Sequence, residues 1–350
     1  MMIDLDDQEN LARLDPEGML GAIEGFPEQC REALDLGPSI PVGLSRPERI
    51  VATGMGGSGI VGDLLGRLLE LPVTANRGYG LPPVDERDLV IGISYSGETE
   101  ETLSSIEIAL ERGTRLLLVS SDGELEQLAR ERGVPFIKIP GGLQPRAALG
   151  YLLLPILKVF AEAELFPEGE LRHLPEFLQK IGSRWRRTAP LADNPAKGLA
   201  RWLYGQVPLI YGVGGTTDVA ALRWKTQTHE NAKQLGFWNM IPELCHNEIV
   251  GFERADLLSN MRVILLRSAS DHPRNRARLE ILRPFLKERG VEYEEVWAAG
   301  EERLAQLLSL IHLGDFVSAY LALLNGVDPT PVRPIAEFKE RLRQWSSTEG

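Results

Sequence analysis

Short apolar runs alternate with longer amphipathic stretches between residues 49 and 139. The apolar runs have the length of strands and cover residues 49–53, 73–76, 88–94, 115–119 and 135–139. Apolar residues at helical spacing predict helices over 60–71, 98–112 and 124–132. Strands that are apolar throughout and separated by helices are typical of a parallel sheet buried on both faces. The pattern therefore predicts an α/β fold here.

The alternation stops between residues 162 and 200, where prolines stand among charged stretches, and this predicts a helical connector. Strands are then predicted over 207–211, 261–266 and 292–297, and helices over 217–233, 274–289, 304–324 and 335–345. One or two helices are expected over 10–36. These predictions divide the chain into an N-terminal helical segment (1–45), a first α/β subdomain (46–161), the connector (162–200), a second α/β subdomain (201–330) and a C-terminal helix (331–350).

The two predicted subdomains carry the same motifs in the same order. Gly54-Met55-Gly56-Gly57-Ser58 and Gly212-Val213-Gly214-Gly215-Thr216 each follow a strand and open a helix. Ser94-Tyr95-Ser96 and Ser268-Ala269-Ser270 each end a strand that comes after a helix. Two motifs repeated in order indicate an internal duplication. We therefore predict two doubly wound parallel sheets in tandem, each with helices on both faces.

Charge and cysteine content narrow the range of partners. The 350 residues carry 38 basic and 50 acidic side chains, and the net charge of −12 disfavours binding to a nucleic-acid backbone. Cys30 and Cys245 are the only cysteines, so a disulfide scaffold is excluded and a reducing compartment is expected. The apolar runs are too short for the ~20 residues of a membrane span, and the acidic start lacks a signal-peptide pattern. We expect a cytoplasmic protein without nucleic-acid or membrane partners.

Two turns in the first subdomain carry candidate ligand-binding groups. Gly54 to Ser58 is rich in glycine, which lets a backbone approach a ligand closely, and it opens a helix whose first amides attract anions. Ser94 to Thr99 adds hydroxyls at the carboxyl end of a strand, where parallel sheets bind ligands. Hydroxyls and amides without arginine suit a compact phosphomonoester. A tight turn and a helix cap at Ser96 explain the same residues structurally.

Together these residues resemble a known domain. Gly56-Gly57-Ser58 followed by Ser94-x-Ser96-Gly97-x-Thr99 resembles the sugar isomerase domain, which binds phosphosugars through a flavodoxin-like fold. Four further segments resemble the bifunctional phosphoglucose/phosphomannose isomerase family: residues 145–149, 229–233 and 246–251, and Phe338-Lys339. The resemblance covers about residues 45–345. It implies that the substrate phosphate is bound by Gly57, Ser58, Ser94, Ser96 and Thr99.

Aldose–ketose isomerisation needs a base that moves a proton between C1 and C2, a ring-opening group and a cation for the enediolate. The resemblance assigns Glu230 as the base, His246 to ring opening, and Arg146 and Lys339 as cations, with no metal or other cofactor. On spacing alone, each of these residues would be read as structural or solvated. Glu230 lies ~20 Å along its helix from the second glycine loop, so it must act on a sugar held by the first subdomain.

The resemblance also implies a partner. In this family the ring-opening histidine is expected to come from a neighbouring subunit, which would make the enzyme a homodimer with a shared active site. The apolar run from Leu149 to Val159 fits such an interface, and it fits a buried core helix equally well. The expected substrates are small sugar phosphates.

The predicted activity is interconversion of glucose 6-phosphate and fructose 6-phosphate, and also of mannose 6-phosphate, through a cis-enediol. The alternatives are a non-catalytic phosphosugar-binding regulator and an isomerase for another sugar phosphate. The chain has no helix-turn-helix pattern, which argues against the regulator. An aminosugar-phosphate synthase needs a glutamine-hydrolysing domain with an N-terminal cysteine, and this chain begins Met1-Met2-Ile3. Val332 occupies the position of a threonine expected in the bifunctional family; valine keeps nearly the same shape, and any hydrogen bond from the threonine hydroxyl is lost.

Overall fold

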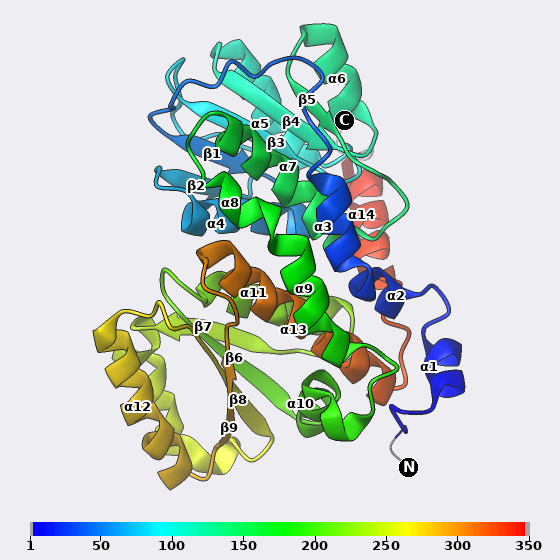
Figure 1. Cartoon of the computed structure of the whole chain (residues 1–350), viewed down its shortest axis with the longest axis vertical. Helices are drawn as coiled ribbons and strands as arrows, with labels where there is room; N and C mark the ends of the chain where they lie inside the picture. Colours follow the sequence, from blue (N-terminus) through cyan, green and yellow to red (C-terminus); the bar gives the residue numbers. More distant parts are fainter. Residues whose placement is uncertain (1–2, 347–350) are drawn as a thin grey trace.

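The computed structural model describes residues 3–346, which form two α/β subdomains stacked along the long axis of the molecule (Figure 1). The first sheet contains β1 (Ile50–Thr53), β2 (Val73–Asn76), β3 (Leu89–Ile93), β4 (Arg115–Ser120) and β5 (Phe136–Lys138). All four strand pairs are parallel, and the order is β2-β1-β3-β4-β5. This is the flavodoxin-like order, so the predicted fold class is confirmed for the first half.

Helices cover both faces of this sheet because successive strand residues point to opposite sides. On one face α4 (Gly56–Leu68) and α7 (Leu149–Glu162) pack against Ile50, Ala52 and Ile91. On the other face α5 (Glu100–Glu111) and α6 (Glu124–Arg132) pack against Val51, Val90 and Leu118. Helix α7 contains the apolar run that the sequence left open, and its buried side chains make it a core helix.

The second sheet repeats this design with β6 (Val207–Val213), β7 (Phe237–Ile241), β8 (Met261–Arg267) and β9 (Glu292–Trp297). Its strands are parallel in the order β7-β6-β8-β9. Helix α12 (Pro273–Glu288) covers the face of Val263 and Leu265, while α11 (Asp218–Glu230) and α13 (Arg303–Leu324) cover the face of Ile264 and Leu266. Two sheets with corresponding strand orders agree with an internal duplication.

One hydrophobic core joins the two subdomains. Helix α13 is long and apolar enough to cross a membrane by length and composition, but its residues are buried inside the protein. Helices from the N-terminus and the connector pack around it: α2 (Met19–Glu24), α3 (Phe26–Ala33), α9 (Leu174–Gly182) and α10 (Pro195–Leu203). The short helices α1 (Gln8–Leu14) and α8 (Glu168–Arg172) complete this layer. The core therefore fixes how the subdomains face each other.

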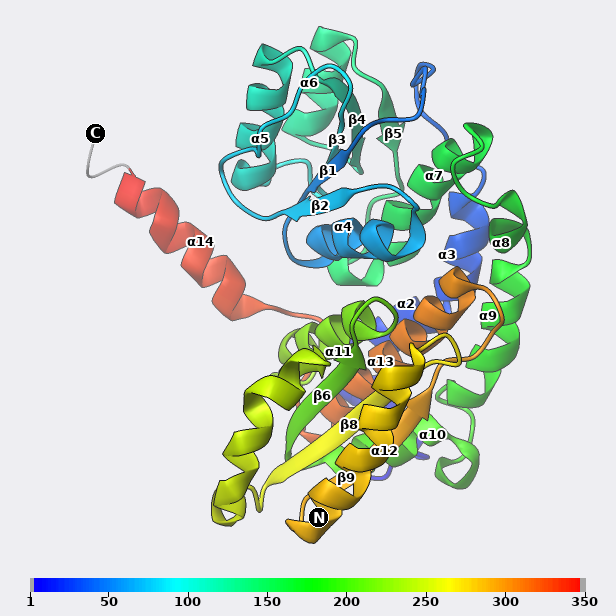
Figure 2. The ribbon, with the colours of Figure 1, turned by 90° about the vertical axis from the view of Figure 1, so that its left-hand side faces the viewer.

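The last helix behaves differently from the rest. Helix α14 (Arg333–Ser346) leaves the body and projects away from both subdomains (Figure 2). Residues 333–345 are exposed, including the large apolar side chains Ile335, Phe338, Leu342 and Trp345. Their spacing of three and four residues places them along one side of the helix. An apolar stripe that is exposed on a projecting helix is typical of a surface that another element covers.

Candidate active site

The two predicted loops of the first subdomain lie in contact. Ser58, in the first turn of α4, is buried, and its Oγ accepts a hydrogen bond of 3.2 Å from the amide of Tyr95. Strands β1 and β3 are neighbours in the sheet, so their carboxyl ends present both loops at one edge. The predicted hydroxyl cluster is therefore brought together around the N-termini of α4 and α5.

The hydroxyls of the second loop also hold the loop itself. Ser94 Oγ lies 2.9 Å from Thr99 Oγ1 and accepts a 3.1 Å hydrogen bond from the amide of Gly97. Ser96 is exposed and its Oγ accepts from the amide of Glu98 at 3.3 Å. These hydroxyls can therefore stabilise the loop and also bind a ligand, because each can still donate or accept one more hydrogen bond.

Gly57 links these loops to Arg146. A Cβ added at Gly57 would lie 2.9 Å from the amide nitrogen of Arg146 and 3.0 Å from its Cα. No side chain fits at that distance, so a glycine allows the short 3-10 turn Pro145–Ala147 to pack directly on the start of α4. The sequence placed Gly57 in a phosphate loop; the structure adds this packing role.

Arg146 is almost completely buried, with 2% of its surface exposed, and most of its donors are committed. Its Nε donates to Asn231 Oδ1 at 2.7 Å, and its Nη2 donates to the carbonyls of Pro329 and Thr330 at 2.8 and 2.7 Å. Its Nη1 lies 3.6 Å from Glu230 Oε2. Burial lowers the pKa of the Arg146 guanidinium, and the negative charge of Glu230 opposes that change.

Helix α11 places Glu230 beside Arg146, because both ends of the helix are bonded to the first subdomain. At its start, Asp218 accepts hydrogen bonds from Arg67 Nε and Nη2 at 3.1 and 2.7 Å. At its end, Glu230 pairs with Arg146 while keeping 24% of its side chain exposed. The carboxylate is therefore held beside a cation and remains accessible to a ligand.

Below Arg146 lies a buried polar layer that the sequence analysis missed. Arg223 Nη2 donates to the carbonyl of Arg146 at 2.7 Å, and its guanidinium forms a two-point ion pair with Asp315 at 3.1 and 2.7 Å. Asn231, which binds Arg146, donates in turn to Ser318 at 2.9 Å. The available signal was an acidic residue, Asp315, inside the mostly apolar stretch that forms α13.

The segment before α14 closes one side of the site. The carbonyls of Pro329 and Thr330 bind Arg146, and Thr330 is buried with an Oγ1 that has no hydrogen-bond partner among residues 3–346. Val332, two residues further on, is half-buried. A polar residue of this segment close to Arg146 was not anticipated from the sequence.

Within residues 3–346, two of the predicted site residues, His246 and Lys339, do not contact Glu230 or Arg146. His246 is exposed in the 3-10 turn Glu243–His246, beyond the carboxyl end of β7. Glu230 lies at the other end of the same sheet, because α11 runs back from the carboxyl end of β6 over about 18 Å. Lys339 is exposed on α14. Within the described part of the chain, no hydrogen bond or ion pair joins His246 or Lys339 to Glu230 or Arg146.

Comparison with known proteins agrees with this arrangement. Residues 43–139 match the SIS domain model, and residues 192–342 match the model of the bacterial phospho-glucose isomerase C-terminal SIS domain. The chain is 39% identical over 336 residues to the bifunctional phosphoglucose/phosphomannose isomerase of Caldicellulosiruptor bescii, covering 93% of this chain and 99% of that one. It is 35% identical to the Aquifex aeolicus enzyme of the same name, covering 94% and 99%.

The chain belongs to the bifunctional phosphoglucose/phosphomannose isomerase family. A similar solved structure is the glucose-6-phosphate isomerase-like protein of Thermus thermophilus, with a TM-score of 0.65 and 25% identity over 94% of this chain and 98% of that one. The predicted family and the predicted enzyme class, an isomerase, are confirmed.

In this member of the isomerase family, the second copy of the glycine loop is occupied by the protein's own carboxylates. Asp271 accepts hydrogen bonds from the hydroxyl of Thr216 and from the amide of Ser268, the latter at 2.9 Å. Asp218 accepts from the amide of Gly215 at 3.2 Å. The matching positions in the first subdomain are Gly57, Ser58 and Ser94. An anion at this loop would have to compete with these carboxylates for the same donors, so the second glycine loop is poorly suited to bind a phosphate.

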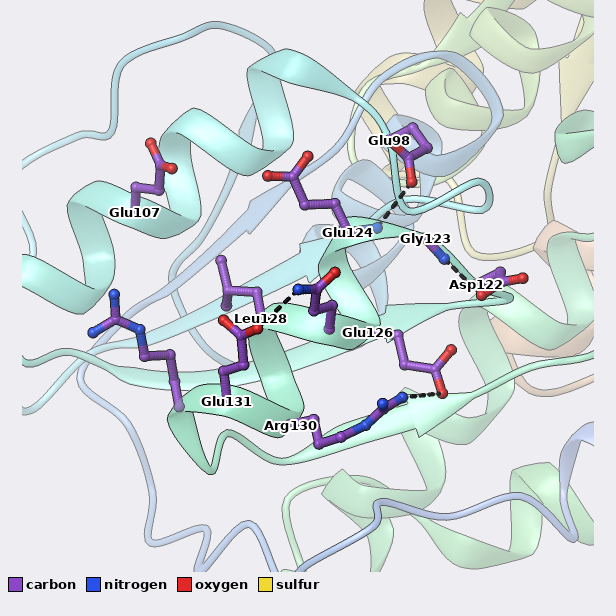
Figure 3. A pocket seen from close by; sticks show the side chains of 11 residues that line it. Glu98, Glu107, Asp122, Gly123, Glu124, Glu126, Leu128, Arg130 and Glu131 are labelled. Carbon is purple, nitrogen blue, oxygen red and sulfur yellow. Dashed lines mark hydrogen bonds and ion pairs between the residues drawn. The ribbon is translucent and has the colours of Figure 1, made fainter.

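A cavity on the first subdomain is also unsuited to a phosphosugar (Figure 3). It lies beside α6, and acidic side chains line most of it: Glu98, Glu107, Asp122, Glu124, Glu126 and Glu131. Glu98 uses its carboxylate to accept from the amide of Glu124 at 2.9 Å, which caps α6. Within residues 3–346, no three His, Cys, Asp or Glu side chains are grouped so as to hold a metal ion. The candidate active site of this isomerase is therefore the Arg146 region.

Proposed function

We propose that the chain interconverts glucose 6-phosphate and fructose 6-phosphate, and also mannose 6-phosphate and fructose 6-phosphate. The observation that carries the proposal is the pair formed by Glu230 and the buried Arg146, which lies against the hydroxyl loops of the first subdomain. Membership of the bifunctional isomerase family supports the same substrates.

In the proposed reaction, the phosphate binds at Gly57, Ser58, Ser94, Ser96 and Thr99. The Glu230 carboxylate takes a proton from C2 of the aldose and returns it to C1, through a cis-enediol. Negative charge grows on the sugar oxygens as that proton leaves. The Arg146 guanidinium stabilises this charge, because it is buried and is held in place before the reaction begins.

The proposal includes a homodimer with a shared active site. Glu230 and His246 lie at opposite ends of the second sheet, so one small sugar cannot contact both side chains of the same subunit. A second copy that brings its His246 to the first copy's Glu230 removes the difficulty. The exposed apolar residues Ile335 and Phe338 of α14 support a surface that a second copy covers, and Lys339 on the same helix would then reach a site.

We place the dimer in the cytoplasm. Cys30 and Cys245 are both free thiols, as a reducing compartment would keep them. The net charge of −12 favours small substrates over nucleic acid.

A coupled assay of the purified chain with each aldose 6-phosphate tests the proposal. We expect turnover of both, with the hexose phosphates in equilibrium through fructose 6-phosphate. Tight binding of sugar phosphates without turnover would replace the proposal with the regulatory alternative, and no binding of either sugar would contradict both.

A further inference from the structure

Lys233 has a backbone conformation that lysine rarely adopts. It follows the last turn of α11 with a φ of 53°, in the left-handed region where glycine is the usual residue after a helix. A side chain at this position strains the backbone, so a non-glycine residue here calls for a reason. Glu164, which follows α7 with a φ of 59°, is the other non-glycine residue with a positive φ among the described residues.

The ammonium group of Lys233 connects the parts of the active site. Its Nζ donates to the carbonyl of Glu230 at 2.8 Å and to the carbonyl of Pro329 at 2.9 Å. The Pro329 carbonyl also accepts from Arg146 Nη2. One lysine thus bonds the end of the helix that presents the base and the segment that fixes the cation.

The surrounding charges make this contact sensitive to pH. Although the side chain is exposed as a whole, its ammonium lies against the protein, and partial burial followed by the Arg146 charge lowers the pKa of Lys233 to about 8. Three carboxylates, Asp328, Glu230 and Glu17, oppose the change. Lys233 is therefore charged below that pH, and it loses its charge as the pH rises through about 8.

We propose that Lys233 is a positioning residue for the isomerase reaction. Its ammonium fixes the position of Glu230 relative to Arg146, because it bonds the carbonyl of Glu230 and the Pro329 carbonyl that also binds Arg146. This inference rests on the proposed function. Lys233 does not act on the sugar itself. Its strained backbone is kept because a glycine at this position would lose the direct bonds from Nζ to the carbonyls of Glu230 and Pro329 and leave Arg146 as the link between them.

The test compares K233G, K233M and the matched control E164G with the wild-type enzyme. K233G relieves the backbone strain, so we expect its unfolding temperature to equal or exceed that of the wild type. K233M keeps the strain and removes the ammonium, with its charge and its two hydrogen bonds. In both variants we expect kcat to fall about tenfold to a hundredfold with KM within about threefold, since small errors in position are costly in catalysis. E164G should gain stability and keep wild-type kcat.

The pH profile separates positioning from a merely structural role. We expect wild-type kcat to fall above pH 8 as Lys233 loses its proton, and K233M to show a lower kcat without that decline. Wild-type kcat in K233M, or the same alkaline decline in both enzymes, would overturn the inference and leave the proposed function intact. If the wild type turns over neither aldose phosphate, the proposed function fails, and the inference fails with it.

Discussion

A buried arginine needs hydrogen-bond partners for its N–H donors. Two nitrogens of the Arg146 guanidinium are bonded within the protein, and the third has only longer contacts. Nε and Nη2 are bonded to Asn231 and to two carbonyls at 2.7–2.8 Å. Nη1 has longer contacts, 3.6 Å to Glu230 and 3.5 Å to Gln144, so it is the donor most available to a developing oxyanion. The sequence identified Arg146 only through a family motif, because its burial depends on partners up to 184 residues away.

Replacing Glu230 with glutamine tests the base. The amide keeps the shape of the side chain and loses its basicity, so kcat should fall about a hundredfold or more while phosphosugar affinity stays within a few fold. Steady-state kinetics and a binding titration measure the two effects. E107Q, on the exposed side of α5, is the control and should be fully active. Glu230 is not the base if E230Q keeps kcat within tenfold.

Gly57 gives a second prediction, about stability. In G57A the new methyl group would lie 2.9 Å from the Arg146 amide, so the variant should lose about 1–3 kcal/mol of unfolding free energy. Activity should fall as well, because Arg146 must shift. The matched control is G66A in the same helix, where a Cβ would make an ordinary contact of 3.7 Å and should stabilise by about 1 kcal/mol. Denaturant unfolding measures both; equal effects would contradict the packing role.

Most strands and helices were predictable because each carries its own hydrophobic pattern, as in β3, whose residues are buried throughout. The strand β7 was missed. It is an edge strand of five residues, mostly half-buried or exposed, and Asn239 interrupts its short apolar run. The structural difference between the duplicated loops could have been read from the sequence. Asp271 stands where the first copy has Gly97, and Asp218 where it has Ile60.

That difference predicts unequal roles for two loop threonines. T99V removes a hydroxyl from the phosphate loop and should raise KM for glucose 6-phosphate about tenfold, the effect of losing one hydrogen bond to a charged group. T216V removes a hydroxyl from the second glycine loop, where the partner is the protein's own Asp271, and should leave KM unchanged. The assignment of the phosphate to the first subdomain fails if T216V raises KM and T99V does not.

At the scale of the molecule, the chain is one body in which Arg146 contacts both Gly57 of the first subdomain and Glu230 of the second, while His246 and α14 face outward. The sequence predicted the tandem architecture because each half repeats one pattern. It could not predict the path of α14, since the apolar stripe of a helix looks the same whether it covers its own core or another subunit.

A mixing experiment tests the shared site. E230Q and H246A homodimers should each be inactive, but a mixed dimer contains one site with the Glu230 of one subunit and the His246 of the other. Random pairing of co-expressed subunits should therefore restore about one quarter of wild-type activity. If both residues act within one subunit, every site of the mixed dimer carries one defect and no activity returns.

Proton exchange tests the central claim most directly, because it follows the step assigned to Glu230 beside Arg146. Fructose 6-phosphate is incubated in D2O with the wild-type enzyme or with E230Q, and NMR follows deuterium at C1 of the sugar. We predict that the wild type incorporates deuterium and that E230Q, although it still binds the sugar, does not. Deuterium incorporation by E230Q at the wild-type rate, or none by an actively isomerising wild type, would contradict the account.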